Sequence, residues 1–131
     1  MITLEKLARI AHGSWSPAAP AGTVGRVSTD SRSLGTGDLF FAIRGEKFDG
    51  NRFLPDVVKR GAVAAVVDGD VPGKLELPIL RVQDSVEALA ALAREHRKTL
   101  RGTVIAITGS NGKTTTKDMV HHVLAKGARA A

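Results

Sequence analysis

The sequence predicts an α/β fold. Short apolar runs that suit buried strands alternate with segments whose apolar residues recur at helical spacing, which is typical of α/β domains. The last apolar run, residues 103–107, leads directly into a Gly/Ser/Asn loop that ends in Gly-Lys-Thr, the pattern of a strand that opens into a phosphate-binding loop. We therefore expect one α/β domain over residues 1–100 and the start of a second domain over residues 101–131.

The first helix is expected over residues 3–12, where the apolar residues fall on one face, Thr3 can cap the N-terminus and Gly13 can end it. A Pro/Ala/Gly loop without periodicity follows. The other expected elements of the first domain are strands 24–29 and 39–43, a short helix 52–60, strands 62–67 and 78–82, and a helix that Asp84 caps and that runs to about Leu100.

The segment 103–107 is apolar at consecutive positions rather than at alternate ones. Strands of this kind are usually buried on both faces in the middle of a parallel sheet. A helix is expected over residues 117–126, and no later strand follows it. The sequence therefore predicts only the first strand, loop and helix of a nucleotide-binding domain.

Composition restricts the class of protein. The 131 residues fit one ordinary domain, or one domain plus part of another. No cysteine is present, which excludes disulfides, thiolate metal sites and cysteine nucleophiles. No apolar stretch approaches the ~20 residues that span a bilayer, and the acidic Glu5 argues against a signal peptide. We expect a cytoplasmic protein without a membrane partner.

The net charge of +6 could indicate a nucleic-acid binder, but its location argues otherwise. Residues 1–100 hold 14 Lys and Arg against 12 Asp and Glu, whereas residues 101–131 hold five against one. Most of the excess therefore belongs to the loop and the helix after it. No aromatic cluster is interleaved with the basic residues. These features favour a phosphorylated small ligand over nucleic acid, which remains an alternative.

The loop TGSNGKTTT, residues 108–116, has the residue types that hold a triphosphate. Glycines let successive backbone N–H groups approach the phosphates, and the helix that follows adds its positive end. Lys113 would reach the outer phosphates, and the hydroxyl of Thr114 or Thr115 would hold Mg²⁺. Ile107 stands where the general pattern has its first glycine, so the match is to a shorter form. The alternative is an ordinary turn with an exposed lysine.

A second series of polar residues and glycines occupies residues 29–32, 37–42 and 45–53, at the ends of predicted strands. Ligands bind at strand ends in open α/β sheets. Taken singly, each residue also has a structural explanation. Asp30 and Arg32 can form a surface ion pair of little energetic value, and the phenylalanines at 40, 41 and 53 suit the core better than a base-stacking surface.

Taken together, these residues resemble the Mur ligases of peptidoglycan synthesis. Asp30-Ser31-Arg32, followed by Gly-Asp-Leu-Phe-Phe-Ala at 37–42 and by Gly-x-x-x-Asp-Gly at 45–50, is similar to the N-terminal domain of that family. Residues 108–115 resemble its ATP loop, which also lacks the first glycine. Within the family, residues 45–49 and 116–119 look most like the ligase that adds D-Ala-D-Ala. The resemblance extends to about Lys126.

The resemblance implies a small UDP-substrate-binding domain, built of a mixed sheet with helices, followed by the first strand, loop and helix of a P-loop ATPase domain. In the whole enzyme, ATP with Mg²⁺ phosphorylates the terminal carboxylate of a UDP-N-acetylmuramoyl peptide, and the amine of D-Ala-D-Ala attacks the acyl phosphate. The 131-residue chain is expected to bind the UDP-muramoyl peptide without catalysing the ligation. The alternative is a free-standing UDP-sugar-binding or regulatory protein.

The resemblance also implies two sets of binding residues and no catalytic residue in this chain. Asp30 and Arg32 would mainly fix their loop. Asn51 stands where relatives often have histidine, so a role there is binding rather than proton transfer. The substrate-binding candidates are Thr29, Asp30, Ser31, Arg32, Glu46, Lys47, Phe48, Asp49 and Asn51. The ATP-binding candidates are Gly109, Ser110, Asn111, Gly112, Lys113, Thr114 and Thr115, of which Thr114 and Thr115 are the candidate Mg²⁺ ligands.

Overall fold

The computed structural model describes residues 2–18, 20–46 and 48–126. The chain divides into two compact units, Met1–Leu100 and Arg101–Ala131.

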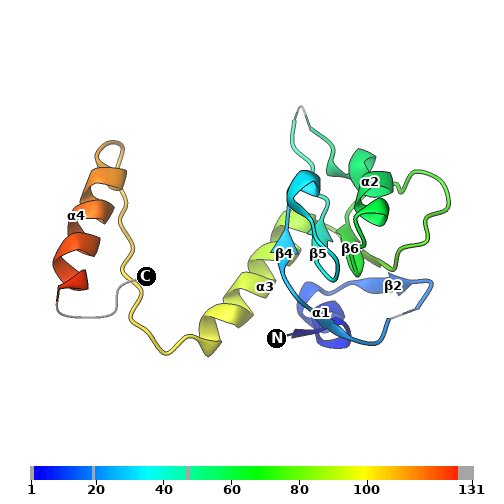
Figure 1. Cartoon of the computed structure of the whole chain (residues 1–131), viewed down its shortest axis with the longest axis horizontal. Helices are drawn as coiled ribbons and strands as arrows, with labels where there is room; N and C mark the ends of the chain where they lie inside the picture. Colours follow the sequence, from blue (N-terminus) through cyan, green and yellow to red (C-terminus); the bar gives the residue numbers. More distant parts are fainter. Residues whose placement is uncertain (1, 19, 47, 127–131) are drawn as a thin grey trace. The chain divides into compact units, whose positions relative to one another are not determined.

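The first unit is built on a five-stranded sheet with the strand order β2-β7-β6-β5-β4 (Figure 1). Four strands are parallel: β4 (Val27–Ser28), β5 (Leu39–Phe41), β6 (Ala64–Val67) and β7 (Ile79–Arg81). The fifth, β2 (Ser14–Ser16), pairs antiparallel with β7 at one edge. The predicted mixed sheet is therefore confirmed. A separate antiparallel pair joins β1 (Ile2–Thr3) to β3 (Thr23–Val24).

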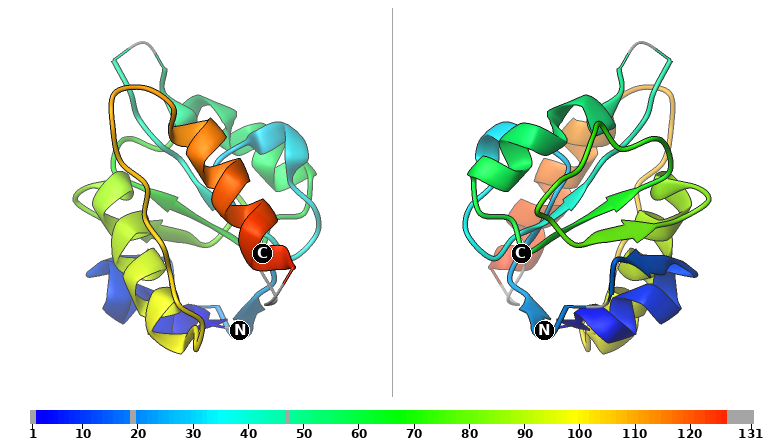
Figure 2. Two further views of the ribbon diagram at one scale, coloured as in Figure 1. Left: turned by 90° about the vertical axis from the view of Figure 1, so that its left-hand side faces the viewer. Right: turned by 90° about the vertical axis from the view of Figure 1, so that its right-hand side faces the viewer.

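Helices cover both faces of this sheet (Figure 2). The helices α1 (Leu4–Ala11) and α3 (Ser85–Thr99) pack on one face, and α2 (Leu54–Lys59) packs on the other. Successive strand residues point to opposite faces, so one strand serves two apolar clusters. Phe41 and Val66 belong to the α1/α3 cluster, whereas Phe40 and Val67 belong to the α2 cluster. The predictions that Phe40 and Phe41 lie in the core are confirmed.

Both predicted helix caps are present. Thr3 Oγ1 accepts a hydrogen bond of 3.2 Å from the backbone N–H of Lys6 at the start of α1. Asp84 Oδ1 accepts from the N–H groups of Val86 and Glu87, at 2.7 and 2.9 Å, at the start of α3. These bonds satisfy N–H groups that have no partner within the helix. The end of α1 differs slightly from the prediction, because His12, with φ 51°, makes the left-handed turn before Gly13.

The predicted strand 24–29 is two strands in two sheets. Its middle residue, Arg26, turns its side chain to the buried Asp38, whose Oδ2 accepts from Arg26 Nη2 at 2.7 Å and from Gly35 N at 2.8 Å. This carboxylate ties Arg26, which lies between β3 and β4, to the turn at Gly35. The predicted helix 52–60 likewise begins with a 3₁₀ turn, η2 (Gly50–Phe53), before α2.

The strand β2 was not predicted. Its sequence, Ser-Trp-Ser, contains a single apolar residue, so it carries no strand pattern. Trp15 pairs with Leu80, and the strand forms because β7 offers a free edge.

The second unit contains the helix α4 (Lys113–Ala125), which begins four residues earlier than the helix predicted at 117. The predicted strand at 103–107 is wrong for this structure, which assigns no strand there. Val104 and Ile105 are 58% and 57% exposed. A strand needs a neighbouring backbone to pair with its N–H and C=O groups, and no part of the chain that the structure describes pairs with this segment. Among the described helices, none is long and apolar enough to cross a membrane.

Candidate functional site

The two predicted substrate segments lie at the same edge of the five-stranded sheet. β4 and β5 are parallel neighbours, so the residues that follow each strand emerge at the same edge. Residues 29–32 follow β4, and residues 44–51 follow β5 after a short connection. The structure thus brings the two segments together, although 11 residues separate them in the printed sequence.

The segment after β4 is held by Asp30. Its Oδ1 accepts from Arg32 N at 2.9 Å and from Arg32 Nε at 3.0 Å, and its Oδ2 accepts from Arg32 Nη2 at 2.9 Å. The backbone bond caps the 3₁₀ turn η1 (Ser31–Ser33). Asp30 and Arg32 therefore shape this turn, as predicted, and Ser31 is presented at its first position, half-buried.

The ion pair between Asp30 and Arg32 makes the stability of the fold depend on pH. Hydrogen bonds from the Arg32 side chain, and then from its backbone N–H, lower the pKa of Asp30 from 3.8 to about 2. Because the folded pKa lies below the unfolded one, the pair stabilises the fold above about pH 3.8 and loses this contribution as the pH falls through about 2. In an Arg32→Met variant we expect the pKa of Asp30 to rise toward 3.8. Carboxyl ¹³C NMR would measure it, with Arg97→Met as the control; equal midpoints in the variant and the wild type would contradict the prediction.

The segment after β5 folds back as a tight hairpin. Gly45 N donates to Phe48 O at 2.7 Å, and Gly50 N donates to Ile43 O at 3.0 Å. Asp49 caps the next turn, because its Oδ1 accepts from Asn51 N at 3.0 Å. Glu46 is exposed on this hairpin. The predicted substrate contact at Lys47 lies outside the described residues.

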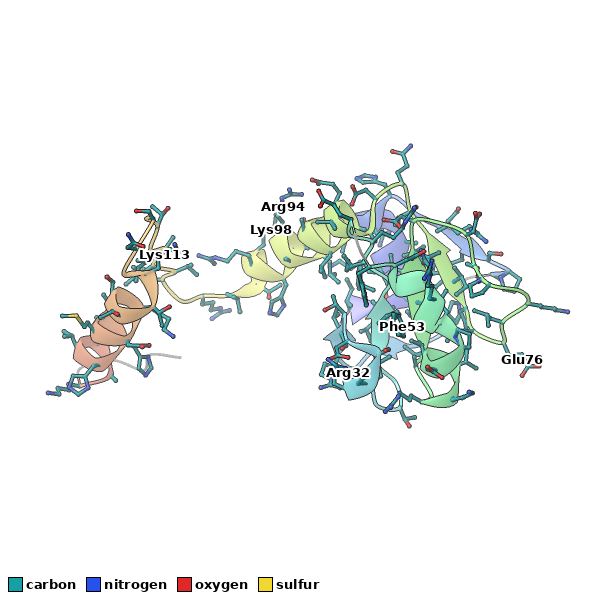
Figure 3. The ribbon with its side chains drawn as sticks, turned by 90° about the horizontal axis from the view of Figure 1, so that it is seen from above. Arg32, Phe53, Glu76, Arg94, Lys98 and Lys113 are labelled. Carbon is teal, nitrogen blue, oxygen red and sulfur yellow. The ribbon has the colours of Figure 1, made fainter. Side chains whose placement is uncertain are left out.

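An aromatic pair accompanies the hairpin. The rings of Phe48 and Phe53 stack with centroids 5.3 Å apart and planes at 19°. Phe48 is 55% exposed, so much of its ring faces solvent. Phe53, which is labelled together with Arg32 in Figure 3, is half-buried and belongs to neither apolar cluster. The prediction that Phe53 is a core residue is therefore wrong: the sequence could not show that its ring supports a neighbouring ring instead.

Asn51 differs from the other candidates in burial. It is 3% exposed, and its Oδ1 is buried with no hydrogen-bond partner among the described residues. Its Nδ2 lies beside Gly69, which follows β6, and Arg44 lies there as well. The sequence reasoning missed Arg44 and Gly69. The one signal that could have indicated them was the Asp-Gly pair that follows the buried strand β6.

The predicted phosphate loop has the backbone that its glycines allow. Gly109 and Gly112 have φ of 149° and 76°, conformations that side-chain-bearing residues rarely adopt. Gly112 is the N-cap of α4 and provides no side-chain hydrogen bond, and the first turn of the helix contains no acid. Its N–H groups and the positive end of the helix dipole are therefore available to an anion.

Lys113, labelled in Figure 3, folds back over this loop. Its Nζ donates to Gly109 O at 2.5 Å and lies 3.5 Å from Ser110 O. The residues fit the phosphates of a nucleotide, because backbone donors, a cation and the hydroxyls of Thr114 and Thr115 all come from one turn. Support for Mg²⁺ is limited to those hydroxyls: the described residues contain no group of three His, Cys, Asp or Glu that could hold a metal.

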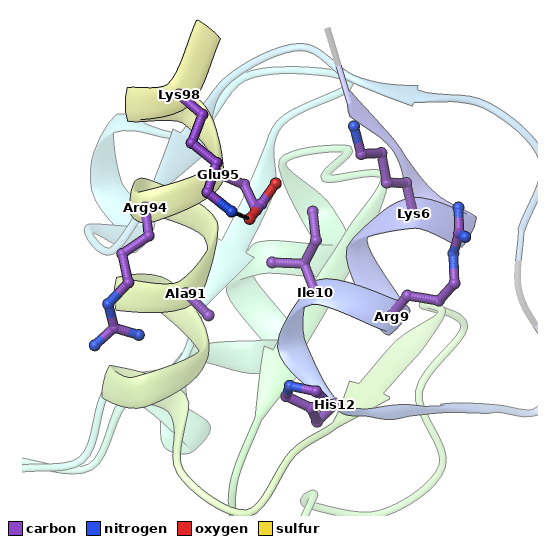
Figure 4. Close-up of a pocket in the computed structure, with 8 residues that line it drawn as sticks. All are labelled: Lys6, Arg9, Ile10, His12, Ala91, Arg94, Glu95 and Lys98. Atoms are coloured by element: carbon purple, nitrogen blue, oxygen red, sulfur yellow. Dashed lines mark hydrogen bonds and ion pairs between the residues drawn. The ribbon is translucent and has the colours of Figure 1, made fainter.

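A cavity elsewhere in the first unit is separate from these residues. It has a volume of about 500 Å³ and lies between α1 and α3 (Figure 4). None of the predicted binding residues lines it. Its lining residues are Lys6, Arg9, Ile10, His12, Ala91, Arg94, Glu95 and Lys98. Four of these eight are Lys or Arg, and Lys98 pairs with Glu95, the one acid among them.

Comparison with known proteins places these features in a family. The model described as "Mur ligase family, catalytic domain" matches residues 23–97, and the model described as "Mur ligase middle domain" matches residues 107–130. The chain is 38% identical, over 124 residues, to the UDP-N-acetylmuramoyl-tripeptide–D-alanyl-D-alanine ligase of Bacillus subtilis (strain 168). The match covers 93% of this chain and 27% of that relative.

Solved structures give the same result. A crystal structure of MurF from Acinetobacter baumannii matches with a TM-score of 0.84 and 37% identity, over 95% of this chain and 28% of that one. MurF ligase from Thermotoga maritima in complex with ADP matches with a TM-score of 0.68 and 36% identity, over 78% of this chain and 23% of that one. The chain thus spans about a quarter of the length of these relatives.

Proposed function

Because the chain belongs to the Mur ligase family, we propose that it forms part of a ligase that adds D-Ala-D-Ala to UDP-N-acetylmuramoyl tripeptide. Residues 1–100 are its substrate-binding domain, and residues 101–131 begin its ATP-binding domain. One observation supports this most: the parallel pair β4–β5 presents the segments 29–32 and 44–51 at one edge of the sheet. The ligation belongs to the complete enzyme. The relatives are about 3.5 times as long as this chain, because the match covers only 27% and 28% of their length.

The uridine diphosphate end of the substrate binds at this edge. Asp30 and Arg32 hold the turn that presents Ser31, whose hydroxyl can donate to an oxygen of the nucleotide. The exposed ring of Phe48, supported by Phe53, offers a flat apolar surface to the base. Asp49 and Gly50 hold the hairpin that positions this ring.

The nucleotide that drives the ligation binds at the start of α4. Backbone N–H groups from Gly109 to Thr115 hold the phosphates, and Lys113 turns from the loop carbonyls to the outer phosphates. The hydroxyl of Thr114 or Thr115 contributes to Mg²⁺. When bound, ATP would supply the phosphoryl group that activates the peptide carboxylate for attack by the amine of D-Ala-D-Ala.

Calorimetry with UDP-N-acetylmuramoyl tripeptide tests the proposal. We expect the 131-residue chain to bind it, and a Ser31→Ala variant to bind about two- to tenfold more weakly, the effect of one lost hydrogen bond. Ser16→Ala, on the distant edge strand β2, is the matched control. Absence of heat with the wild type, or equal affinity of the Ser31→Ala variant, would refute the assignment. Binding to DNA with a steep salt dependence would favour the nucleic-acid alternative.

A further inference from the structure

Three hydrogen-bond donors from different elements converge on Gly69. A Cβ built at Gly69 would lie 3.1 Å from Asn51 Nδ2 and 3.2 Å from Arg44 Nη1, so both groups already crowd this position. Arg81 reaches it from the other side, where its Nη1 donates to Gly69 O at 3.2 Å. A side chain at position 69 would therefore push these donors outward by a few tenths of an ångström.

The topology explains why these residues meet. Gly69 follows β6, which lies between β5 and β7 in the sheet. Arg44 comes from the segment after β5, and Arg81 is the last residue of β7. Alternation along each strand puts the side chain of Arg81 on the face of Ile79, a residue of the α2 cluster. The donors thus gather at the carboxyl edge of three parallel strands, where α/β sheets bind ligands.

No carboxylate neutralises this cluster. Within the described residues, neither Arg44 nor Arg81 forms an ion pair within 4.0 Å, although Asp68 and Asp70 flank Gly69 in the chain. The Asp68 carboxylate is turned away, because its Oδ2 accepts from Ser85 N and Ser85 Oγ at 3.0 and 2.9 Å. Two like charges are thus held at one glycine with no carboxylate of the described residues within ion-pair distance.

Asn51 supplies an independent indication. Its side chain is almost fully buried, and its Oδ1 has no partner within the described residues. Leaving such an acceptor unmet costs about 1–3 kcal/mol. The other amide atom of this side chain, the donor Nδ2, lies beside Gly69 on the side of Arg44.

We propose that Arg44, Arg81 and Asn51 form an anion site over Gly69 that accepts a phosphoryl group, beside the proposed uridine site. Guanidinium groups suit this role, since their planar fork of N–H donors matches phosphoryl oxygens. The phosphoryl group comes either from the diphosphate of the bound nucleotide or from a free phosphate or pyrophosphate. The site rests on the contacts around Gly69 and does not depend on the proposed ligase activity.

Amide NMR titrations of the 131-residue chain with pyrophosphate, UDP and uridine test the site. Arg44→Met and Arg81→Met each remove one charge and keep the apolar stem, and Arg94→Met on α3 is the matched control. We expect either substitution to weaken pyrophosphate binding about three- to tenfold, with uridine binding unchanged. Gly69→Ala keeps both charges but displaces Arg44 and Asn51. It therefore weakens binding only if these side chains form the anion site over Gly69.

The outcomes separate the two sources. If UDP binding weakens together with pyrophosphate binding, the anion is the diphosphate of the nucleotide; if UDP binding does not change, the site takes a free anion. Pyrophosphate that fails to bind the wild type, or that binds both methionine variants as well as the wild type, overturns the site. If pyrophosphate binds through Arg44 and Arg81 while UDP-N-acetylmuramoyl tripeptide does not bind, the proposed function fails and the anion site stands.

Discussion

A Gly50→Ala variant is expected to lose about 2–4 kcal/mol of its free energy of unfolding and to bind the UDP-muramoyl peptide at least about tenfold more weakly. The added Cβ would lie 2.8 Å from both Ile43 N and Ile43 O and 2.9 Å from Ala42 C. These are backbone atoms next to β5, so they cannot move aside as a side chain can. The hairpin must open, which breaks the bond from Gly50 N to Ile43 O and displaces Phe48.

The matched control is Gly45→Ala in the same hairpin. There the added Cβ would meet, among the described residues, only Phe48 O at 3.9 Å, which is an ordinary contact. Urea denaturation and calorimetry would measure stability and affinity in both variants. For a domain of about 100 residues, a loss of 2 kcal/mol or more lowers the melting temperature by roughly 10 °C. Equal stability of the two variants would show that the hairpin does not hold the geometry described.

A Lys113→Ala variant is expected to bind Mg·ADP about 10- to 100-fold more weakly than the wild-type chain. Among the described residues, Lys113 is the cation that direct hydrogen bonds place on the loop, to Gly109 O and Ser110 O. A charge-assisted hydrogen bond to a phosphate contributes about 1.5–3 kcal/mol, which corresponds to this change in affinity. Titration followed through the amide signals of residues 109–115 would measure it.

Lys117→Ala is the control, since this lysine lies one turn later in α4 and pairs with Asp118 at 3.0 Å. It carries the same charge and lies only four residues from Lys113. Loss of a positive charge by itself would therefore weaken binding in both variants. Equal affinities of the Lys113→Ala variant and the wild type for Mg·ADP would show that this loop does not bind the phosphates as proposed.

Local sequence patterns determined the elements that depend on neighbouring residues. The apolar spacing of α1 and α3, with caps at Thr3 and Asp84, predicts both helices, because cap and helix face lie within a few residues. The fully apolar runs predict β5 and β6, which are buried on both faces. The family resemblance also came from the residues alone, since its motifs are contiguous.

Only the tertiary structure decided the features that depend on distant backbone. β2 exists because β7 pairs with it, and the predicted strand 103–107 is absent because no described segment pairs with it. Residues 24–29 divide between two sheets, and Arg26 at the division is bound to the buried Asp38, 12 residues later in the chain. Likewise, Arg44 and Arg81 meet at Gly69 only because three strands align. A local pattern can show that a segment is apolar enough to be buried, but which segments pair or meet is set by residues far apart in the sequence.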